Sequence, residues 1–279
     1  MAIEVSPTTG VIGAEVRGVD LRLPLDPSDR SVIDEALLDH LVLFFRDQDL
    51  DDEQHRDFAA QFGPLEPFVL APPANPDVPE MHVLRFDHGS AARGSNVDSW
   101  HADGTYMDRP PLGTVLRAVE LPPHGGDTCW ANMYAAYEAL SAPVKRALEG
   151  LSAVHDFAKI SYTTFDDAAD PAAELDRVRQ RYPAVRHPVV RTHPVTGRKV
   201  LFVHRNYTVR IEELTARENE VLLPWLFDHV RDPAFQCRFR WSPGAVALWD
   251  NRATQHYGVP DYAGPRVMHR VVIAGDRPR

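Results

Sequence analysis

The chain contains 279 residues, of which 44% are hydrophobic and 25% charged, and these ordinary globular values exclude a disordered or fibrous protein. No apolar run approaches the roughly 20 residues of a membrane helix, and the first ten residues predict no secretory signal. The formal net charge of -10 argues against non-specific nucleic-acid binding, because neutralising phosphates requires clustered Lys and Arg. Two cysteines, Cys129 and Cys237, are too few for a disulfide framework and predict a reduced, cytoplasmic protein.

The first third of the chain predicts two helices beside a sheet. Residues 10–21 alternate apolar and polar side chains between glycines, which predicts a strand pair at a sheet edge. Residues 28–48 predict a helix that runs into a strand over 41–45, and residues 51–65 predict a second helix. Residues 69–99 are rich in Pro, Gly, Asp and Ser, which predicts a long loop with a functional or lid role.

The rest of the chain reads as short strands separated by turns. One or two short helices are predicted over 133–151, another helix over 218–230, and a mobile insertion or lid over 162–181. The strand-like segments are 114–121, 188–193, 199–204, 237–241, 245–250 and 269–275. No glycine-rich phosphate loop follows any of them. The pattern predicts one domain over 1–279, mostly β with helical decorations, and favours an antiparallel core such as a jelly roll over a parallel doubly wound sheet.

Two His-x-Asp tripeptides are candidate metal-binding pairs in this chain with 13 histidines. His55 and Asp57 lie in a predicted helix, where residues two apart point about 200° from each other, so this pair is interpreted as a solvated helix face. His101 and Asp103 lie in an extended segment, where residues two apart project on the same side and can bind one cation. The alternative is that His101 and Asp103 bond only to each other or to backbone.

A third ligand is needed, and the distal candidate is His256, which follows the predicted strand 245–250 and is expected at a strand end or first turn. Two histidines and one carboxylate on one side of a metal leave other positions open, as in non-haem Fe(II) oxygenases. His187 and His193 are rival ligands, but we interpret them as structural. Trp100, Trp130 and Trp249 flank the motifs and are predicted to pack in the core rather than to line the pocket.

A cationic end is predicted beside the metal. If residues 266–270 form a strand, Arg266, Met268 and Arg270 share one face. Two arginines on one face of an interior strand are costly unless they meet carboxylate or sulfonate groups, which match the guanidinium fork; pairing with Asp is the alternative. The hydroxyl of Thr128 can donate a hydrogen bond to the carboxylate of an anionic cosubstrate that one of these arginines binds.

The ordered motifs WHAD, GGDT, WDNRATQH and RVMHR resemble the taurine dioxygenase and 2,4-dichlorophenoxyacetate dioxygenase (TauD/TfdA) family of Fe(II)- and 2-oxoglutarate-dependent enzymes, over nearly the whole chain. The resemblance implies a double-stranded β-helix, a homo-oligomer (dimer or tetramer), and O2-dependent hydroxylation of a small organic anion with release of succinate and CO2. It implies three iron ligands, His101, Asp103 and His256. It further implies that Thr128 and Arg266 bind 2-oxoglutarate, and that Arg270 faces the anion of the substrate or cosubstrate.

The expected substrate pocket departs from that of a taurine dioxygenase. Phe68 and Ala71 take the places of a sulfonate-binding His and a Tyr, and Val97 takes the place of an Asn unless Asn96 substitutes for it. With Tyr207, these residues form the candidate pocket. It is more apolar than a taurine site, which favours an alkyl sulfate, an aryloxyalkanoate or another apolar acid. The alternative function is a jelly-roll protein that binds a metal or small acid without turnover.

Overall fold

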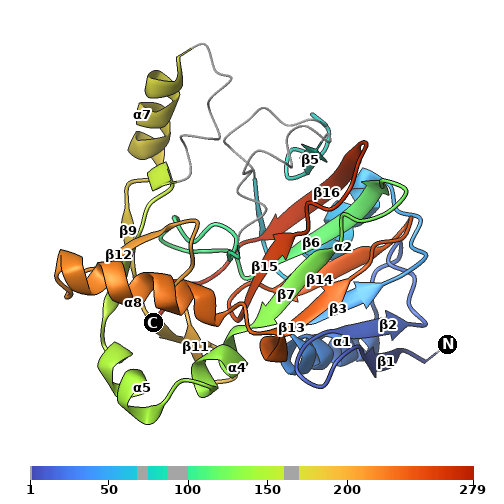
Figure 1. The fold of residues 1–279 in the computed structure, drawn as a ribbon. Coiled ribbons are helices and arrows are strands. Elements are labelled where there is room, and N and C mark those ends of the chain that lie inside the picture. Colours follow the sequence, from blue (N-terminus) through green and yellow to red (C-terminus); the bar gives the residue numbers. More distant parts are fainter. Residues whose placement is uncertain (1, 68–74, 87–99, 160–169) are drawn as a thin grey trace.

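The computed structural model describes residues 2–67, 75–86, 100–159 and 170–279. Its main element is a twisted sheet of eight strands (Figure 1). In spatial order these are β1 (Glu4–Pro7), β2 (Ala14–Arg17), β3 (Val42–Phe45), β14 (Val246–Asp250), β6 (Gly113–Glu120), β16 (Arg266–Ile273) and β4 (Leu65–Glu66), with β5 (His82–Phe86) also paired to β16. All these pairs are antiparallel except β2 with β3.

A second, smaller sheet packs against this one. It contains β13 (Gln236–Phe239), β7 (Thr128–Asn132) and β15 (Thr254–Gly258), all antiparallel. One hydrophobic core joins the two sheets, because Ala247 and Met268 of the large sheet cluster with Trp130 of the small one. This arrangement is the predicted mostly antiparallel β-fold, the double-stranded β-helix or jelly roll.

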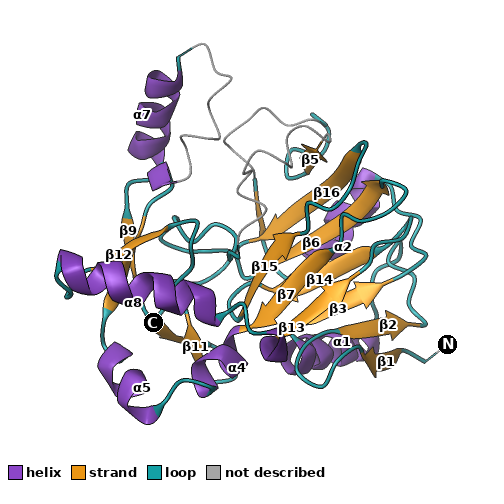
Figure 2. Cartoon of the chain, in the orientation of Figure 1, coloured by secondary structure: helices purple, strands orange, loops and turns teal. Residues whose placement is uncertain are grey.

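Helices cover both the large sheet and the far end of the molecule (Figure 2). The helices α1 (Pro27–His40) and α2 (Asp52–Ala60) close a second core on the outer face of the large sheet. At the other end lie α4 (Met133–Glu138), α5 (Ala142–Leu148), α7 (Pro171–Arg181), α8 (Ala216–His229) and the short helix Pro233–Phe235. None of the described helices combines the length and apolar character needed to cross a bilayer.

Small sheets complete the helical end of the molecule. One contains β12 (Thr208–Ile211), β8 (Ser152–His155) and β9 (Val185–Pro188), and the other pairs β10 (Val190–Thr192) with β11 (Lys199–Leu201). Trp130 and Trp249 are fully buried in the core, and Trp100 is partly buried against it, as predicted; Trp249 also lines the cavity described below.

Three predicted segments differ from the structure. The N-terminal strand pair lies at Glu4–Pro7 and Ala14–Arg17 rather than within 10–21, because residues 8–13 form the connecting turn, closed by a 2.8 Å hydrogen bond from Thr8 N to Gly13 O. The segments 69–99 and 162–181 are not loops throughout. Strand β5 pairs with β16 in the first, and helix α7 occupies the second, where Asp170 caps its first turn.

Candidate functional site

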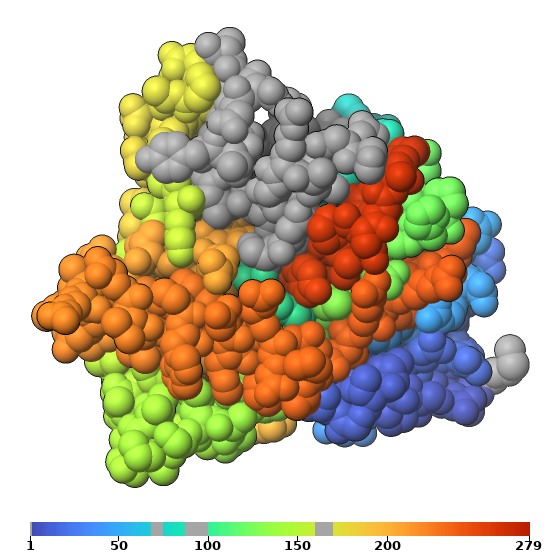
Figure 3. Space-filling model, viewed as in Figure 1, coloured from blue at the N-terminus to red at the C-terminus, as the bar shows by residue number. Residues whose placement is uncertain are grey.

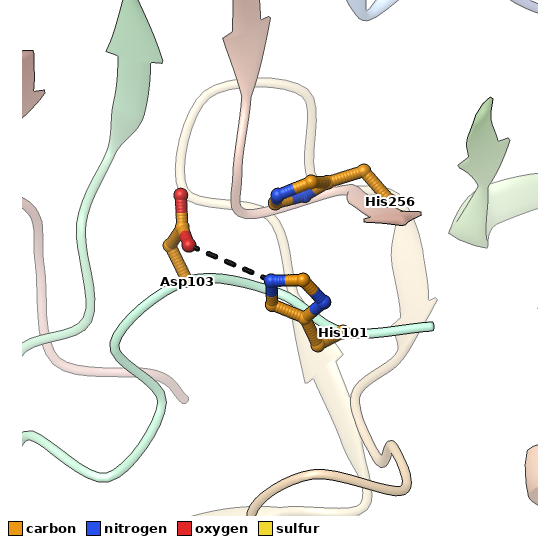
Figure 4. Close-up of side chains that lie close together, drawn as sticks. All are labelled: His101, Asp103 and His256. Atoms are coloured by element: carbon orange, nitrogen blue, oxygen red, sulfur yellow. Dashed lines mark ion pairs between the residues drawn. The ribbon is translucent and has the colours of Figure 1, made fainter. Parts of the chain in front are cut away.

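His101, Asp103 and His256 point toward one another, as Figure 4 shows. One potential ligand atom from each, two imidazole nitrogens and one carboxylate oxygen, lies within 4.8 Å of the others, and all three residues are buried. The Nε2 atom of His101 lies 3.8 Å from Oδ1 of Asp103. Within the described ranges, no other group of three His, Cys, Asp or Glu residues converges in this way. The predicted pair and the predicted distal histidine therefore meet in space.

Backbone and amide hydrogen bonds hold these residues together. His101 and His256 exchange backbone bonds of 3.1 and 2.8 Å in an isolated antiparallel bridge. Asn251, in the turn after β14, accepts from the Asp103 N–H at 2.8 Å and donates to the Asp103 carbonyl at 2.9 Å. His256 lies in the middle of β15 rather than at the expected strand end, because the chain reverses at 251–253 and returns as a strand paired with β7.

The electrostatics of the site keep Asp103 and His256 in the forms that donate electron pairs. Burial alone would raise the pKa of Asp103, but the positive charge of Arg270, followed by His256 and His101, holds that pKa well below its usual range. Burial, and next the neighbouring His101, lowers the pKa of His256 to about 3. At neutral pH the site therefore presents a carboxylate and a neutral His256 imidazole, the forms that bind metals.

Arg270 connects this cluster to β5. Its guanidinium donates to Oδ1 of Asp103 at 3.0 Å and to Nδ1 of His82 at 2.9 Å, while Thr114 donates to the other Asp103 oxygen at 3.1 Å. Residues 82 and 270 are direct partners in the β5–β16 pairing, which explains why their side chains meet. A charged group thus lies between the carboxylate and the edge of the sheet.

Arg266 and Thr128 form a second polar group. Arg266 donates to the Gly126 carbonyl at 3.0 Å and to Oγ1 of Thr128 at 3.4 Å. A Cβ atom at Gly126, where φ is +71°, would lie 3.1 Å from Cδ of Arg266, so the glycine leaves room for the arginine. Arg266 is 6% exposed, and no carboxylate of the described residues forms an ion pair with it. A buried guanidinium without an anion is expensive, so this position suits an incoming anion.

One cavity is lined by His101 and His256 of the histidine-aspartate cluster and by Thr128 and Arg266. Its walls are mainly apolar, and its lining residues are Leu84, Phe86, His101, Leu116, Thr128, Trp249, His256, Gly258, Val259, Pro260, Tyr262, Arg266 and Arg270. The predicted shared face of Arg266 and Arg270 is confirmed, since both line this cavity while the intervening His269 bonds to Asp52 at 2.8 Å on the other face. The cavity can therefore hold a metal and an anion together.

The candidate substrate pocket is only partly placed. Phe68, Ala71, Asn96 and Val97 lie outside the described residues. Tyr207 is described, but it does not line the cavity. It lies in the turn before β12, buried in an aromatic cluster 4.9 Å from Tyr106 between ring centroids.

The remaining histidines of the sequence analysis lie elsewhere. His187 bonds to the carbonyls of Thr105 and Met107, and His193 lies 3.0 Å from Asp250, so both are structural as predicted. His55 contradicts its interpretation as a solvated residue. It is fully buried and its Nε2 lies 3.2 Å from the Val115 carbonyl, because α2 turns this side chain onto the large sheet.

Sequence reasoning missed Asn251 and Trp241. Trp241 donates its indole N–H to Oγ1 of Thr128 at 2.9 Å. The Asp-Asn pair after the strand 245–250 is a turn signal that could have drawn attention to Asn251, although not to its contact with Asp103. Trp241 follows the alternating segment CRFR and carries no comparable signal.

Comparisons with known proteins agree with the geometry. The family model "Taurine catabolism dioxygenase TauD, TfdA family" matches residues 4–272. An alpha-ketoglutarate-dependent sulfate ester dioxygenase of Pseudomonas putida is 38% identical over 100% of this chain and 91% of its own length. An alkylsulfatase of Acinetobacter baylyi is 36% identical over 98% of this chain and 86% of its own length. The crystal structure of a taurine dioxygenase from Burkholderia xenovorans superposes with a TM-score of 0.84 at 38% identity, covering 99% of this chain and 90% of the other.

Proposed function

The chain belongs to the taurine dioxygenase TauD/TfdA family and is a 2-oxoglutarate-dependent non-haem iron dioxygenase, and we propose that its substrate is an organic sulfate ester. The observation that carries the proposal is one mainly apolar cavity lined by Arg266, Arg270 and the two histidines of the His-Asp-His cluster. Each part of the cavity has a separate role.

We propose that His101, Asp103 and His256 hold the iron. The donor set fits, because two imidazoles and one carboxylate, with ligand atoms within 4.8 Å of one another, are the protein ligands that Fe(II) oxygenases use. Asn251 and Thr114 fix the backbone and carboxylate of Asp103. A non-catalytic binding protein would have lost part of this set, and none of it is missing.

Arg266 and Thr128 are proposed to bind the distal carboxylate of 2-oxoglutarate. The unpaired, buried guanidinium supplies the charge and the hydroxyl supplies a hydrogen bond. Leu116 and Trp249 line the same cavity and exclude water from it. When bound, iron and 2-oxoglutarate supply the oxidising power, since O2 is consumed, succinate and CO2 are released, and the substrate gains one hydroxyl group.

A sulfate ester matches the rest of the cavity. Arg270 presents a guanidinium suited to a sulfate group, and Leu84, Phe86 and Val259 provide an apolar wall for an alkyl chain. The two similar relatives named above act, by their names, on sulfate esters. Hydroxylation of the carbon that bears the sulfate places two oxygens on one carbon. The C–O bond to sulfate then breaks, the hydroxyl proton passes to solvent, and an aldehyde remains.

Substrate-dependent succinate release tests this proposal. The protein with Fe(II) and 2-oxoglutarate is assayed with hexyl sulfate, hexanesulfonate, 2,4-dichlorophenoxyacetate and taurine, with Asp103→Ala as the inactive control. We expect hexyl sulfate to give equal amounts of succinate, hexanal and sulfate, with a kcat/KM at least about tenfold above taurine, since an apolar pocket leaves the taurine ammonium unpaired. Taurine turnover that matches the best alternative would overturn the substrate assignment.

We further infer that residues 1–279 act as one catalytic domain, in the cytoplasm and as a homodimer or homotetramer. Both cysteines are free and buried, which supports a reducing compartment. Helix α8, orange at the left of Figure 3, carries Val221 and Trp225, which are 72% and 46% exposed. This apolar pair supports a contact between subunits.

A further inference from the structure

We infer that Trp241 is a positioning residue that fixes the direction of the Thr128 hydroxyl group, so that the site favours an anionic acceptor over a neutral one. The inference rests on the proposed binding of 2-oxoglutarate by Thr128 and Arg266. Trp241 follows β13 and is 7% exposed, and its indole N–H donates to Oγ1 of Thr128 at 2.9 Å. An indole N–H can donate but cannot accept, so the polarity of this bond is fixed.

The hydrogen-bond inventory of Thr128 then determines where its proton points. A hydroxyl oxygen has two acceptor lone pairs and one hydrogen. Trp241 donates to one lone pair and Arg266, at 3.4 Å, donates to the other. Neither partner can accept the hydroxyl hydrogen, and no acceptor for it is found among the described residues. Because Thr128 lines the cavity, its O–H is left to donate there.

Arg266 also offers only donors to this cavity. The proposed subsite therefore presents a guanidinium and a hydroxyl hydrogen, and no carboxylate of the described residues pairs with either. A carboxylate, which has only acceptors, satisfies both groups, whereas a neutral amide would place an N–H against a donor. The charge comes from Arg266, and the direction of the hydroxyl comes from Trp241.

The surroundings of Trp241 keep its N–H in place. Its ring lies 5.1 Å from Phe239 and 6.3 Å from Trp130 between centroids. The indole nitrogens of Trp130 and Trp249 are also buried, but they have no hydrogen-bond partner among the described residues. These two tryptophans therefore act only through their rings, and Trp130, which does not line the cavity, is a natural control for Trp241.

The test measures binding without turnover. Wild type, Trp241→Phe, Thr128→Val and the double variant are loaded with Mn(II), and N-oxalylglycine is titrated by calorimetry. We expect Trp241→Phe to weaken binding roughly fivefold to tenfold, the worth of one hydrogen bond, because the hydroxyl can then turn a lone pair toward the carboxylate. The double variant should bind no more weakly than Thr128→Val alone. N-methyloxamate, which lacks the distal carboxylate, should bind wild type and Trp241→Phe within twofold.

The outcomes separate this inference from the proposed function. Trp130→Phe keeps an aromatic ring beside Trp241 and removes only an indole N–H that has no partner among the described residues, so it should bind N-oxalylglycine within twofold of wild type. If Trp241→Phe also binds within twofold, or if its effect adds to that of Thr128→Val, Trp241 does not act through the hydroxyl and the inference is wrong. If Thr128→Val binds as tightly as wild type, the proposed cosubstrate site itself fails. Thermal unfolding checks folding, and Trp241→Tyr, which also lacks the indole N–H, replaces a Phe variant that does not fold.

Discussion

The tripeptide His-x-Asp occurs twice in this protein, and the side chains of the two copies diverge in one and converge in the other. At 55–57, on helix α2, His55 is buried against the large sheet while Asp57 is exposed and pairs with its neighbour Arg56 at 2.7 Å. At 101–103, both side chains are buried and converge, with 3.8 Å between Nε2 and Oδ1. The same residue types at the same spacing thus form a core contact in one place and a candidate metal site in the other.

Backbone geometry accounts for the difference. On a helix, residues two apart point about 200° from each other, so one side chain of the pair enters the core and the other meets solvent. The 101–103 segment is extended where it bridges to His256, and Asn251 holds it there. A ligand motif therefore carries information only together with the conformation of the chain that presents it.

The largest expected effect is the loss of iron binding and turnover when the tripeptide at 101–103, but not the one at 55–57, is changed. His101→Ala or Asp103→Ala should abolish Fe(II) binding and 2-oxoglutarate turnover, a loss of at least about a thousandfold, because each removes one of three protein ligands. Metal content and succinate release measure this. Asp57→Ala is the matched control and should bind iron and turn over normally. Unchanged succinate production in His101→Ala or Asp103→Ala would contradict the assignment of the site.

The sequence was informative wherever backbone periodicity alone decides the outcome. The alternation within 266–270 correctly placed Arg266 and Arg270 on one face. The helical periodicity of α2 also predicts the burial of His55, since His55 shares the buried face with Phe58 and Ala59, three and four residues later. The helix geometry correctly excluded a shared ion for His55 and Asp57, but it does not make both side chains solvated, and there the interpretation was wrong.

The sequence does not predict contacts between residues that come together only when the strands pair in the folded protein. Asn251 reaches the backbone of Asp103, and Trp241 reaches the hydroxyl of Thr128, across strands far apart in the chain. Neither residue type has a spacing rule that predicts its partner. Tyr207 lies in a buried cluster with Tyr106 and Phe157, and its place in the substrate pocket stays a prediction.

The second expected effect concerns stability rather than chemistry. His55→Ala should lower the free energy of unfolding by about 2–4 kcal/mol, because it leaves a cavity between α2 and the sheet and removes the bond to the Val115 carbonyl. Iron binding should be retained, in contrast to His101→Ala. Urea unfolding followed by circular dichroism measures the change. A stability equal to wild type would show that the contact contributes nothing, and Asp57→Ala should unfold at the wild-type urea concentration.

The smallest expected effect is a change in the pH dependence of stability. Burial, and next the positive charge of Arg117, lowers the pKa of His55 to about 3. The unfolded chain protonates this histidine below about pH 6.5, whereas the folded protein keeps it neutral down to about pH 3. Between these values the unfolded state binds more protons, so stability falls as pH falls, by at most about 1.4 kcal/mol per pH unit from this residue.

His55→Gln isolates that contribution, because glutamine can still donate to the Val115 carbonyl but does not titrate. The variant should lose stability less steeply than wild type between pH 6 and 4, measured as urea unfolding free energies across that range. His124→Gln, which replaces an exposed histidine, should keep the wild-type slope. Since His155 and His204 are also fully buried with pKa values lowered well below the usual range by desolvation, part of the wild-type slope should remain in His55→Gln. If the pH dependence of the unfolding free energy is unchanged in His55→Gln, His55 becomes protonated in the folded state at the same pH as in the unfolded chain. The side chain would then be less firmly packed than its contacts indicate.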